Sequence, residues 1–177
     1  MSQSARGETV FYLQPGECLL TSEQVRVVTV LGSCVAVTFH DPVSRLSAMC
    51  HAVFPNRRCR GKLAEHDSPY RFVDESVFRL VERLERHGVP RARLEVKVFG
   101  GAEVVAQGRP PAPGLAVGRS NVKAAFDALQ SRGLVVQASD LGGRRGRTLV
   151  FSTRTGEVLL KRQGGENGSP VQGGEQQ

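Results

Sequence analysis

Two apolar runs joined by a short polar turn constrain the fold more than any other feature of this sequence. The runs span residues 25–39 and 46–54, and the sequence HDPVSR connects them. Asp41 followed by Pro42 has the chemistry of a type I turn, which favours Asp at its first position and Pro at its second. Apolar runs on both sides of such a turn predict an antiparallel β-hairpin.

The turn also predicts how the two strands of the hairpin pair. A turn centred on Pro42 and Val43 sets Cys34 directly opposite His51, so their Cβ atoms are expected about 4.5–5.5 Å apart. Because side chains alternate along a strand, the same register divides the hairpin into two faces. One face is wholly apolar and suits the core: Val35, Val37, Phe39, Leu46, Ala48 and Cys50. The other is smaller and more polar, as an accessible site needs: Cys34, Ala36, Thr38, Ser47, Met49 and His51.

A thiol beside an imidazole is the minimum apparatus for nucleophilic attack on a carbonyl group. The imidazole of His51 takes the proton of Cys34, and the thiolate is a strong nucleophile. Gly32 and Ser33 bring backbone N–H groups beside the thiol, where an oxyanion would develop. The alternative stays open, because a cysteine in an apolar strand is often an inert small hydrophobic residue and a lone strand histidine is often structural.

The rest of the chain predicts one α+β domain over residues 1–162. Apolar residues recur at helical spacing in the sequence YRFVDESVFRLVERLERHG, where Gly88 ends the helix. A second helix is predicted in SNVKAAFDALQSRG, with Ser120 or Asn121 as its N-cap and Gly133 as its stop. Several strands without strict βαβ alternation indicate helices packed on a sheet or sandwich. Residues 163–177 have almost nothing to bury and are expected to form a disordered tail.

Composition limits the classes of partner and cofactor. The net charge of +7 suits an acidic partner, but only 6% of the residues are aromatic and Trp is absent, so base stacking on single-stranded nucleic acid is not expected. No run is long and apolar enough to span a membrane, and the first residues carry no apolar leader, so we expect no membrane insertion and a cytoplasmic location. The four cysteines are expected as free thiols. No C-x-x-C pair occurs, and we expect no metal and no cofactor.

Several blocks of the sequence, taken in order, resemble the CheD family of bacterial chemoreceptor glutamine deamidases. They are TVLGSCVAV, CHAVFP, VFGGA, VGRSNV and DLGGRRGRTLVFSTRTGEVLLKR, and the resemblance runs from about Gly16 to Arg162. It implies a layered α/β sandwich with mixed or antiparallel sheets, related to the catalytic domain of the cytotoxic necrotizing factor toxins. It also implies that Cys34 is the nucleophile, that His51 is the acid and base, and that a receptor glutamine becomes glutamate through a thioester.

The resemblance implies partners as well. The substrate would be the cytoplasmic coiled coil of chemoreceptors, and some family members are also described as methylesterases at the same receptor positions. A CheC-type chemotaxis phosphatase is a further candidate partner. The alternative function is a non-catalytic interaction module that binds receptors or such a phosphatase without chemistry. A nucleic-acid-binding function rests on charge alone.

One family residue does not match this sequence. In some members a threonine six residues before the cysteine steadies the histidine, but here that position is Val28. The nearest threonine is Thr29, which strict alternation puts on the opposite face from Cys34 unless the strand kinks or bulges at Gly32. Thr29 is the candidate third member of the site.

Other motifs have both a structural and a functional interpretation. Gly100 and Gly101 indicate a tight turn or close backbone packing, or alternatively a substrate contact. Arg119 and Asn121 mark a helix start or lie on the substrate side of the site. The arginines of GGRRGR, at positions 144, 145 and 147, would attract an acidic receptor helix by electrostatic steering.

Overall fold

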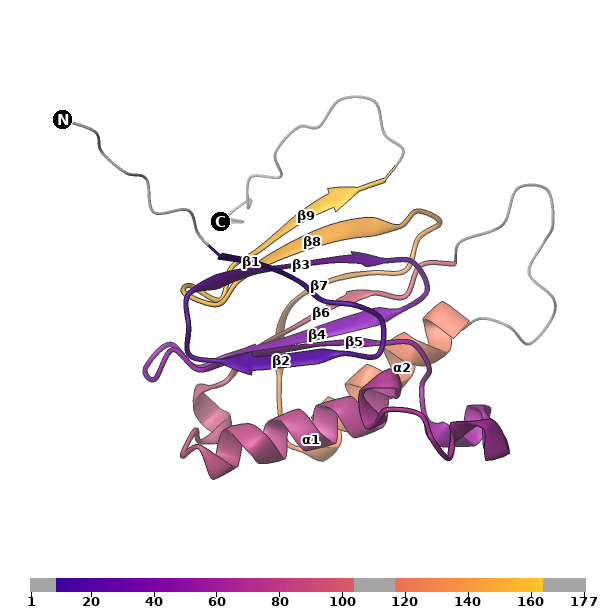
Figure 1. Ribbon diagram of the computed structural model, residues 1–177, viewed down its shortest axis with the longest axis horizontal. Helices are drawn as coiled ribbons and strands as arrows, with labels where there is room; N and C mark the ends of the chain where they lie inside the picture. The colour runs from indigo at the N-terminus through magenta and orange to yellow at the C-terminus, as the bar shows by residue number, and fades with distance from the viewer. Residues whose placement is uncertain (1–8, 104–116, 164–177) are drawn as a thin grey trace, which may run out of the picture.

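The computed structural model describes residues 9–103 and 117–163, and it has three layers. A four-stranded sheet lies on a five-stranded sheet, and helices α1 (Val73–Arg86) and α2 (Val117–Ser131) cover the outer face of the latter (Figure 1). The strands are β1 (Thr9–Tyr12), β2 (Cys18–Thr21), β3 (Val25–Leu31), β4 (Val35–His40), β5 (Ser47–Ala52), β6 (Glu95–Gly100), β7 (Val136–Leu141), β8 (Arg147–Ser152) and β9 (Val158–Arg162). Short 3₁₀ turns are η1 (Arg57–Cys59), η2 (Gly61–Ala64), η3 (Pro69–Arg71) and η4 (Arg91–Arg93).

Both sheets are mixed. The smaller has the order β1-β3-β8-β9, in which only β1 and β3 are parallel. The larger has the order β2-β5-β4-β6-β7, in which only β6 and β7 are parallel. The predicted α+β class, with layered mixed sheets and two main helices, is confirmed. The relation to the necrotizing factor toxins stays a prediction.

The predicted hairpin exists and forms the centre of the molecule. Every residue of β4 and β5 is buried, because the helices cover one face of the hairpin and the smaller sheet covers the other. Val35, Val37 and Cys50 pack with α1 and α2 in one apolar cluster. Ala36 and Met49 pack with the smaller sheet in a second cluster. The face expected to be accessible therefore lies in the gap between the two sheets, which corrects the prediction.

The predicted register of the hairpin is wrong by two residues. Ala36, and not Cys34, lies opposite His51, and His40 lies opposite Ser47. The connecting loop is longer than a four-residue turn, because the Asp41 N–H donates to the Leu46 carbonyl at 2.9 Å, and Arg45 within the loop is left-handed with a φ of 59°. A shift of two residues keeps every side chain on its predicted face, since the alternation along a strand has a period of two.

The apolar run of residues 25–39 is two strands and not one. It forms β3 in the smaller sheet and β4 in the larger sheet, and the chain crosses between the sheets at Gly32–Ser33–Cys34. Cys34 therefore precedes β4 and lies in the crossing turn.

The helix ends agree in part with the predictions. Gly88 and Gly133 follow α1 and α2 with φ angles of 80° and 67°, as expected for glycines that end helices. The predicted N-cap of α2 is wrong, because the helix already begins at Val117 and contains Ser120 and Asn121.

Parts of the predicted organisation lie outside the described residues. Of the predicted tail, only Gln163 is described, so its disorder stays a prediction, as does the single domain over residues 1–162. Within the described ranges, no helix combines the length and apolar character that crossing a membrane requires.

Candidate functional site

Hydrogen bonds to the carbonyl groups of Cys34 and Gly32 hold the turn that carries Cys34. The Cys34 carbonyl accepts a hydrogen bond from the Gly101 N–H at 2.8 Å, and the Gly32 carbonyl accepts one from the Ala102 N–H at 2.9 Å. Among the described residues, the N–H groups of Ser33 and Cys34 donate to no backbone carbonyl. The turn is thus anchored to the end of β6 while two of its donors stay available.

Asn121 ties this turn to the chain that follows His51. Its side chain is fully buried, and its Nδ2 donates to the Ser33 carbonyl at 3.0 Å and to the Val53 carbonyl at 2.9 Å. Gly101 and Gly118 allow the approach, because a Cβ atom at Gly118 would lie 2.5 Å from the Gly101 carbonyl oxygen. Close backbone packing at Gly101 is therefore present, and both donors of the Asn121 amide serve the protein's own backbone.

His51 is buried in the gap between the sheets, and a hydroxyl group orients its ring. The Thr29 hydroxyl donates to the Leu13 carbonyl at 2.8 Å and lies 2.8 Å from His51 Nδ1. Since the only proton of that hydroxyl goes to Leu13, Nδ1 must carry the proton that Thr29 accepts. The other ring nitrogen, Nε2, is then a lone-pair acceptor, and it is buried without a partner among the described residues.

Thr29 reaches His51 because the strand changes sheets after it. Thr29 is buried with Val27 and Leu31 on the inner face of β3, whereas Val28 faces outward. Cys34, after the crossing turn, packs against the same cluster of side chains in the gap. Thr29 and Cys34 thus face one gap, in spite of their odd spacing, through a break in the strand at Gly32.

Burial sets the charge states of the two central groups. Burial lowers the pKa of His51 to about 4, against smaller opposing effects of the Leu13 carbonyl and the Glu17 carboxylate. Burial also raises the pKa of the Cys34 thiol, against smaller opposing effects of its own backbone N–H and of Arg71. At neutral pH the site therefore holds a thiol and an uncharged imidazole rather than an ion pair.

Sequence reasoning missed the residues that hold the backbone of His51. The His51 N–H donates to the Glu17 carbonyl at 3.0 Å, and the His51 carbonyl accepts from the Gly16 N–H at 2.7 Å. Pro15 followed by Gly16 is a typical turn dipeptide, and Gly16 has a φ of 82°. No pattern in the sequence pointed to Arg71, whose charge reaches Cys34 from η3.

Two of the other predicted site residues, Gly101 and Arg119, line a surface cavity. Arg119 is exposed and pairs with Glu103 at 2.8 Å. Arg119, Gly101 and Arg144 line a cavity of about 350 Å³. Arg147 is only 2% exposed and pairs with Asp140, so the expectation that it attracts a partner is wrong. Gly100 has a φ of 112°, and a Cβ atom there would lie 2.2 Å from the Cys34 carbonyl oxygen.

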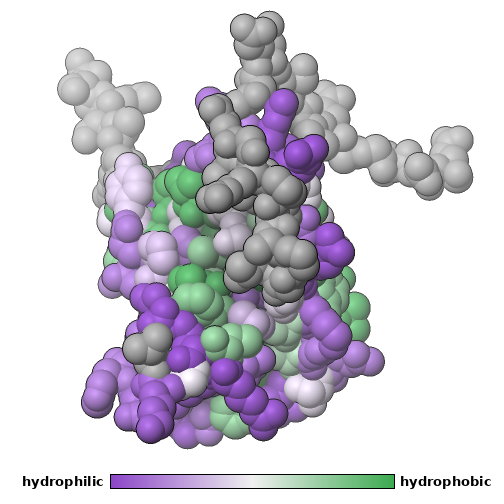
Figure 2. All heavy atoms as spheres, turned by 90° about the vertical axis from the view of Figure 1, so that its right-hand side faces the viewer, coloured by the Kyte–Doolittle hydropathy of each residue, from purple (hydrophilic) through white to green (hydrophobic). Residues whose placement is uncertain are grey.

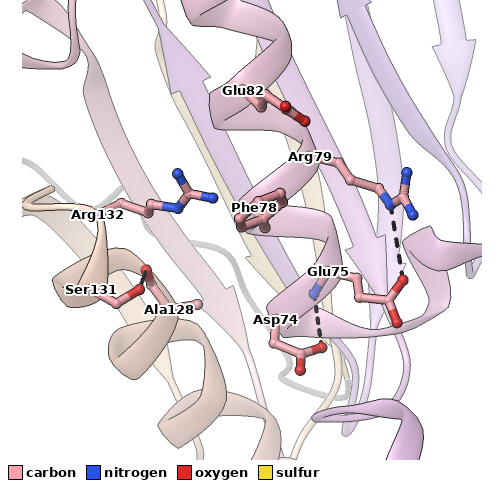
Figure 3. A pocket seen from close by; sticks show the side chains of 8 residues that line it. All are labelled: Asp74, Glu75, Phe78, Arg79, Glu82, Ala128, Ser131 and Arg132. Carbon is pink, nitrogen blue, oxygen red and sulfur yellow. Dashed lines mark hydrogen bonds and ion pairs between the residues drawn. The ribbon is translucent and has the colours of Figure 1, made fainter.

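A second cavity lies on the helical layer, away from the predicted site residues. At the end of the molecule where α2 begins, hydrophobic surface lies between hydrophilic flanks (Figure 2). A cavity of about 470 Å³ lies between α1 and α2, with Phe78 next to the Arg132 guanidinium at 3.8 Å (Figure 3). None of the predicted site residues lines that second cavity.

In the described ranges, no three or more His, Cys, Asp and Glu side chains gather where they could hold a metal ion. All four cysteines are free, and among them Cys50 is buried and Cys59 is exposed.

Comparison with known proteins identifies related chains. The family model described as "CheD chemotactic sensory transduction" matches residues 54–162. The chain is 44% identical over 151 residues to "Probable chemoreceptor glutamine deamidase CheD 2" of Geobacter sulfurreducens, which covers 85% of this chain and 88% of the relative. It is 36% identical over 151 residues to "Chemoreceptor glutamine deamidase CheD" of Thermotoga maritima, with 85% and 90% covered.

These matches differ in what they contain. The family-model match begins after Cys34 and His51, whereas a match that covers 85% of the chain necessarily spans both residues. Among solved structures, "Crystal structure of YlmD from Geobacillus stearothermophilus" aligns at 13% identity with a TM-score of 0.44, covering 78% of this chain and 61% of that one.

Proposed function

This chain belongs to the CheD family, and from that premise we propose that it deamidates glutamine side chains of chemoreceptors, with Cys34 as nucleophile and His51 as acid and base. The observation that carries the assignment of roles is the state of His51. Thr29 holds the proton on Nδ1, and the lone pair of Nε2 is buried, with no partner among the described residues, in the gap that Cys34 also faces. A general base needs such an oriented, unprotonated nitrogen.

The reaction begins from an uncharged pair. As the Cys34 sulfur attacks the side-chain carbonyl carbon of glutamine, His51 Nε2 takes the thiol proton and becomes imidazolium. The imidazolium then gives that proton to the leaving nitrogen, ammonia departs, and a thioester remains. His51 next takes a proton from water, whose oxygen attacks the thioester. Glutamate is released, and the proton returns to the sulfur.

The crossing turn is the proposed oxyanion site. The N–H groups of Ser33 and Cys34 lie beside the sulfur, and the hydrogen bonds to the turn use its carbonyls instead. Donors fixed in this way can stabilise the oxygen of the tetrahedral intermediate without rearranging. The crossing begins at Gly32, directly after β3, and Gly100, Gly101 and Asn121 hold the turn. Arg119 is the exposed candidate for the substrate side.

The proposed partners follow from the same assignment. The substrate is the cytoplasmic coiled coil of a chemoreceptor, and the protein acts in the cytoplasm without a cofactor. A CheC-type chemotaxis phosphatase is a second proposed partner. The net charge of +7 supports an acidic partner surface.

The first experiment is peptide mass spectrometry of a receptor cytoplasmic fragment incubated with the protein. We expect a gain of about one mass unit at specific glutamines, which the Cys34→Ala variant abolishes. Cys59→Ala is the matched control, because Cys59 is a free and exposed thiol outside the site. An unchanged receptor fragment that nevertheless binds the protein would contradict catalysis and favour the non-catalytic interaction module.

A further inference from the structure

Arg71 is the last residue of η3, and it contacts two backbone segments next to His51. Its carbonyl accepts hydrogen bonds from the N–H groups of Val53 at 2.8 Å and Phe54 at 3.0 Å, directly after β5. Its side-chain stem lies on Gly16, since a Cβ atom there would be 2.7 Å from Arg71 Cγ. The Gly16 N–H in turn donates to the His51 carbonyl. Two separate contacts therefore hold Arg71 against the segment that carries His51.

The charge of Arg71 is only partly compensated. Its Nε lies 3.5 Å from Asp67 Oδ1, while Arg60 Nε lies 3.3 Å from Asp67 Oδ2. Both guanidinium groups also face the ring of Phe54, at 5.7 Å for Arg71 and 4.9 Å for Arg60. One carboxylate thus serves two guanidinium groups. Arg71 Nε is buried and has no hydrogen-bond partner within the described residues.

We propose that the Arg71 guanidinium supplies the positive charge that stabilises the Cys34 thiolate as it forms. Arg71 is in this sense a positioning residue, which acts through the sulfur and forms no bond to the substrate. The thiol proton goes to His51 Nε2, and the negative charge left on sulfur is attracted by the charge of Arg71, which η3 holds against the segment that carries His51. This inference rests on the proposed role of Cys34.

The need for such a cation follows from the state of His51. In cysteine nucleophiles an adjacent positive charge favours the thiolate. Burial holds the pKa of His51 near 4, so its uncharged imidazole is a weak base, and a cation that favours the thiolate makes the proton transfer from sulfur less unfavourable. Burial raises the pKa of Cys34, and Arg71 is the side chain whose charge acts in the opposite direction.

The other charged groups near these residues have identifiable effects. The Glu17 carboxylate acts on His51 from the turn before β2. Asp67 and Arg60 act on Arg71 from the 3₁₀ segments. Removing the Asp67 charge should therefore strengthen the effect of Arg71 on the sulfur, and removing the Arg71 charge should weaken it. This pair of opposite signs distinguishes an electrostatic role from a purely structural one.

The test is the pH dependence of Cys34 alkylation, followed at the Cys34 peptide by mass spectrometry. With iodoacetamide at pH 7, we expect Arg71→Gln to slow alkylation about three- to tenfold, because its pH profile moves to higher pH. Arg71→Lys should retain most of the rate. Asp67→Asn should raise the rate by about twofold. Arg58→Gln is the matched control, because Arg58 is an exposed arginine of η1 in the same segment.

A second alkylating reagent distinguishes a change in the charge near Cys34 from a change in the accessibility of its thiol. Iodoacetate is anionic, so the ratio of its rate to that of iodoacetamide should fall in Arg71→Gln and stay unchanged in Arg58→Gln. An unshifted profile in a folded Arg71→Gln variant, or equal slowing in Arg58→Gln, would overturn the proposal. Where Arg71→Gln does not fold, slower alkylation in Asp67→Asn overturns it.

The outcome is independent of the deamidation assay. A protein whose Cys34 reactivity depends on Arg71 but which leaves receptor glutamines unchanged would retain the electrostatic role and lose the proposed function. If deamidation requires Cys34 but the alkylation rate of Cys34 does not depend on Arg71, the proposed function is retained and the electrostatic role of Arg71 is lost.

Discussion

The two ends of the β4–β5 hairpin hold the same arrangement of three groups. At one end, His51 Nδ1 contacts the Thr29 hydroxyl, which donates to the Leu13 carbonyl. At the other end, His40 Nδ1 lies 2.8 Å from the Ser47 hydroxyl, which donates to the Thr153 carbonyl at 2.9 Å. Both histidines are almost completely buried, and burial lowers the pKa of each.

The two ends differ in what lies next to the ring. Gly156 packs on His40 so closely that a Cβ atom would lie 2.7 Å from ring carbon Cδ2. His51 instead has a buried Nε2 without a partner in the part of the chain that the structure describes, and Cys34 packs into the same gap. A histidine–hydroxyl–carbonyl arrangement is thus a way to satisfy a buried imidazole, and it does not by itself indicate catalysis. Chemistry at the His51 end requires the neighbouring thiol turn.

The largest expected effect separates the two histidines directly. His51→Asn should reduce receptor deamidation by about 10²–10⁴-fold, the range for loss of a general acid–base. His40→Asn should leave the rate within about twofold, while each variant loses about 1–3 kcal/mol of stability from an incompletely paired buried group. Mass spectrometry of the receptor fragment and urea unfolding measure the two effects. Similar losses of activity in both variants would remove the distinction between the two ends.

The next effect concerns the hydroxyl groups. Thr29→Val removes the acceptor of the His51 Nδ1 proton, so we expect about a tenfold to hundredfold loss of the deamidation rate, less than for loss of the acid–base group itself. Ser47→Ala removes the equivalent hydroxyl at the His40 end and should change only stability. Thr29→Ser, which keeps the hydroxyl, should retain most of the rate. If Thr29→Val is as active as Thr29→Ser, the orientation of His51 does not depend on this group.

The pH dependence of stability should also follow the histidines. In the unfolded chain His51 titrates near pH 6.5, whereas its pKa in the folded protein is about 4. Between these values the unfolded chain binds more protons, so the free energy of unfolding falls as the pH drops. The contribution of His51 to the free energy of unfolding is complete above about pH 6.5, and its loss toward pH 4 is on the order of 3 kcal/mol.

Urea unfolding at several pH values measures this slope. His51→Asn should flatten the slope of stability against pH. His40→Asn should flatten it less, because burial lowers the pKa of His40 in the same direction but to a smaller extent. An unchanged slope in His51→Asn would show that the ring is protonated or accessible in the folded protein.

The smallest expected effect concerns the close-packed glycines of the two ends. Gly118→Ala would push α2 from Gly101 and displace Asn121, whereas Gly156→Ala would press on the His40 ring. Each should cost about 1–3 kcal/mol through overpacking. Only Gly118→Ala should also lower the deamidation rate, by a few-fold at most, because Asn121 holds the Cys34 turn. Equal activity of the two variants would argue against a role for Asn121 in positioning that turn.

The sequence by itself determined the α+β class, the two faces of the hairpin and the helix ends at Gly88 and Gly133. These features depend on local periodicity and on the backbone freedom of single residues, which the chain carries wherever it folds. For the same reason the faces survived a register error of two residues. The pattern predicts Cys34 and His51 as a pair, although Ala36 and not Cys34 lies across the strand from His51.

Only the tertiary structure decided how the site is built. Nothing in the apolar run of residues 25–39 shows that it crosses from one sheet to the other, since both halves are buried strands. That crossing brings Thr29 to His51 and turns Cys34 into the same gap, and the observed register comes with a longer loop in which the Asp41 N–H donates to the Leu46 carbonyl. The charge of Arg71 acts on Cys34 although 37 positions of sequence separate the two residues. Contacts of this kind depend on which surfaces pack together over long distances, and that packing leaves no local pattern to read.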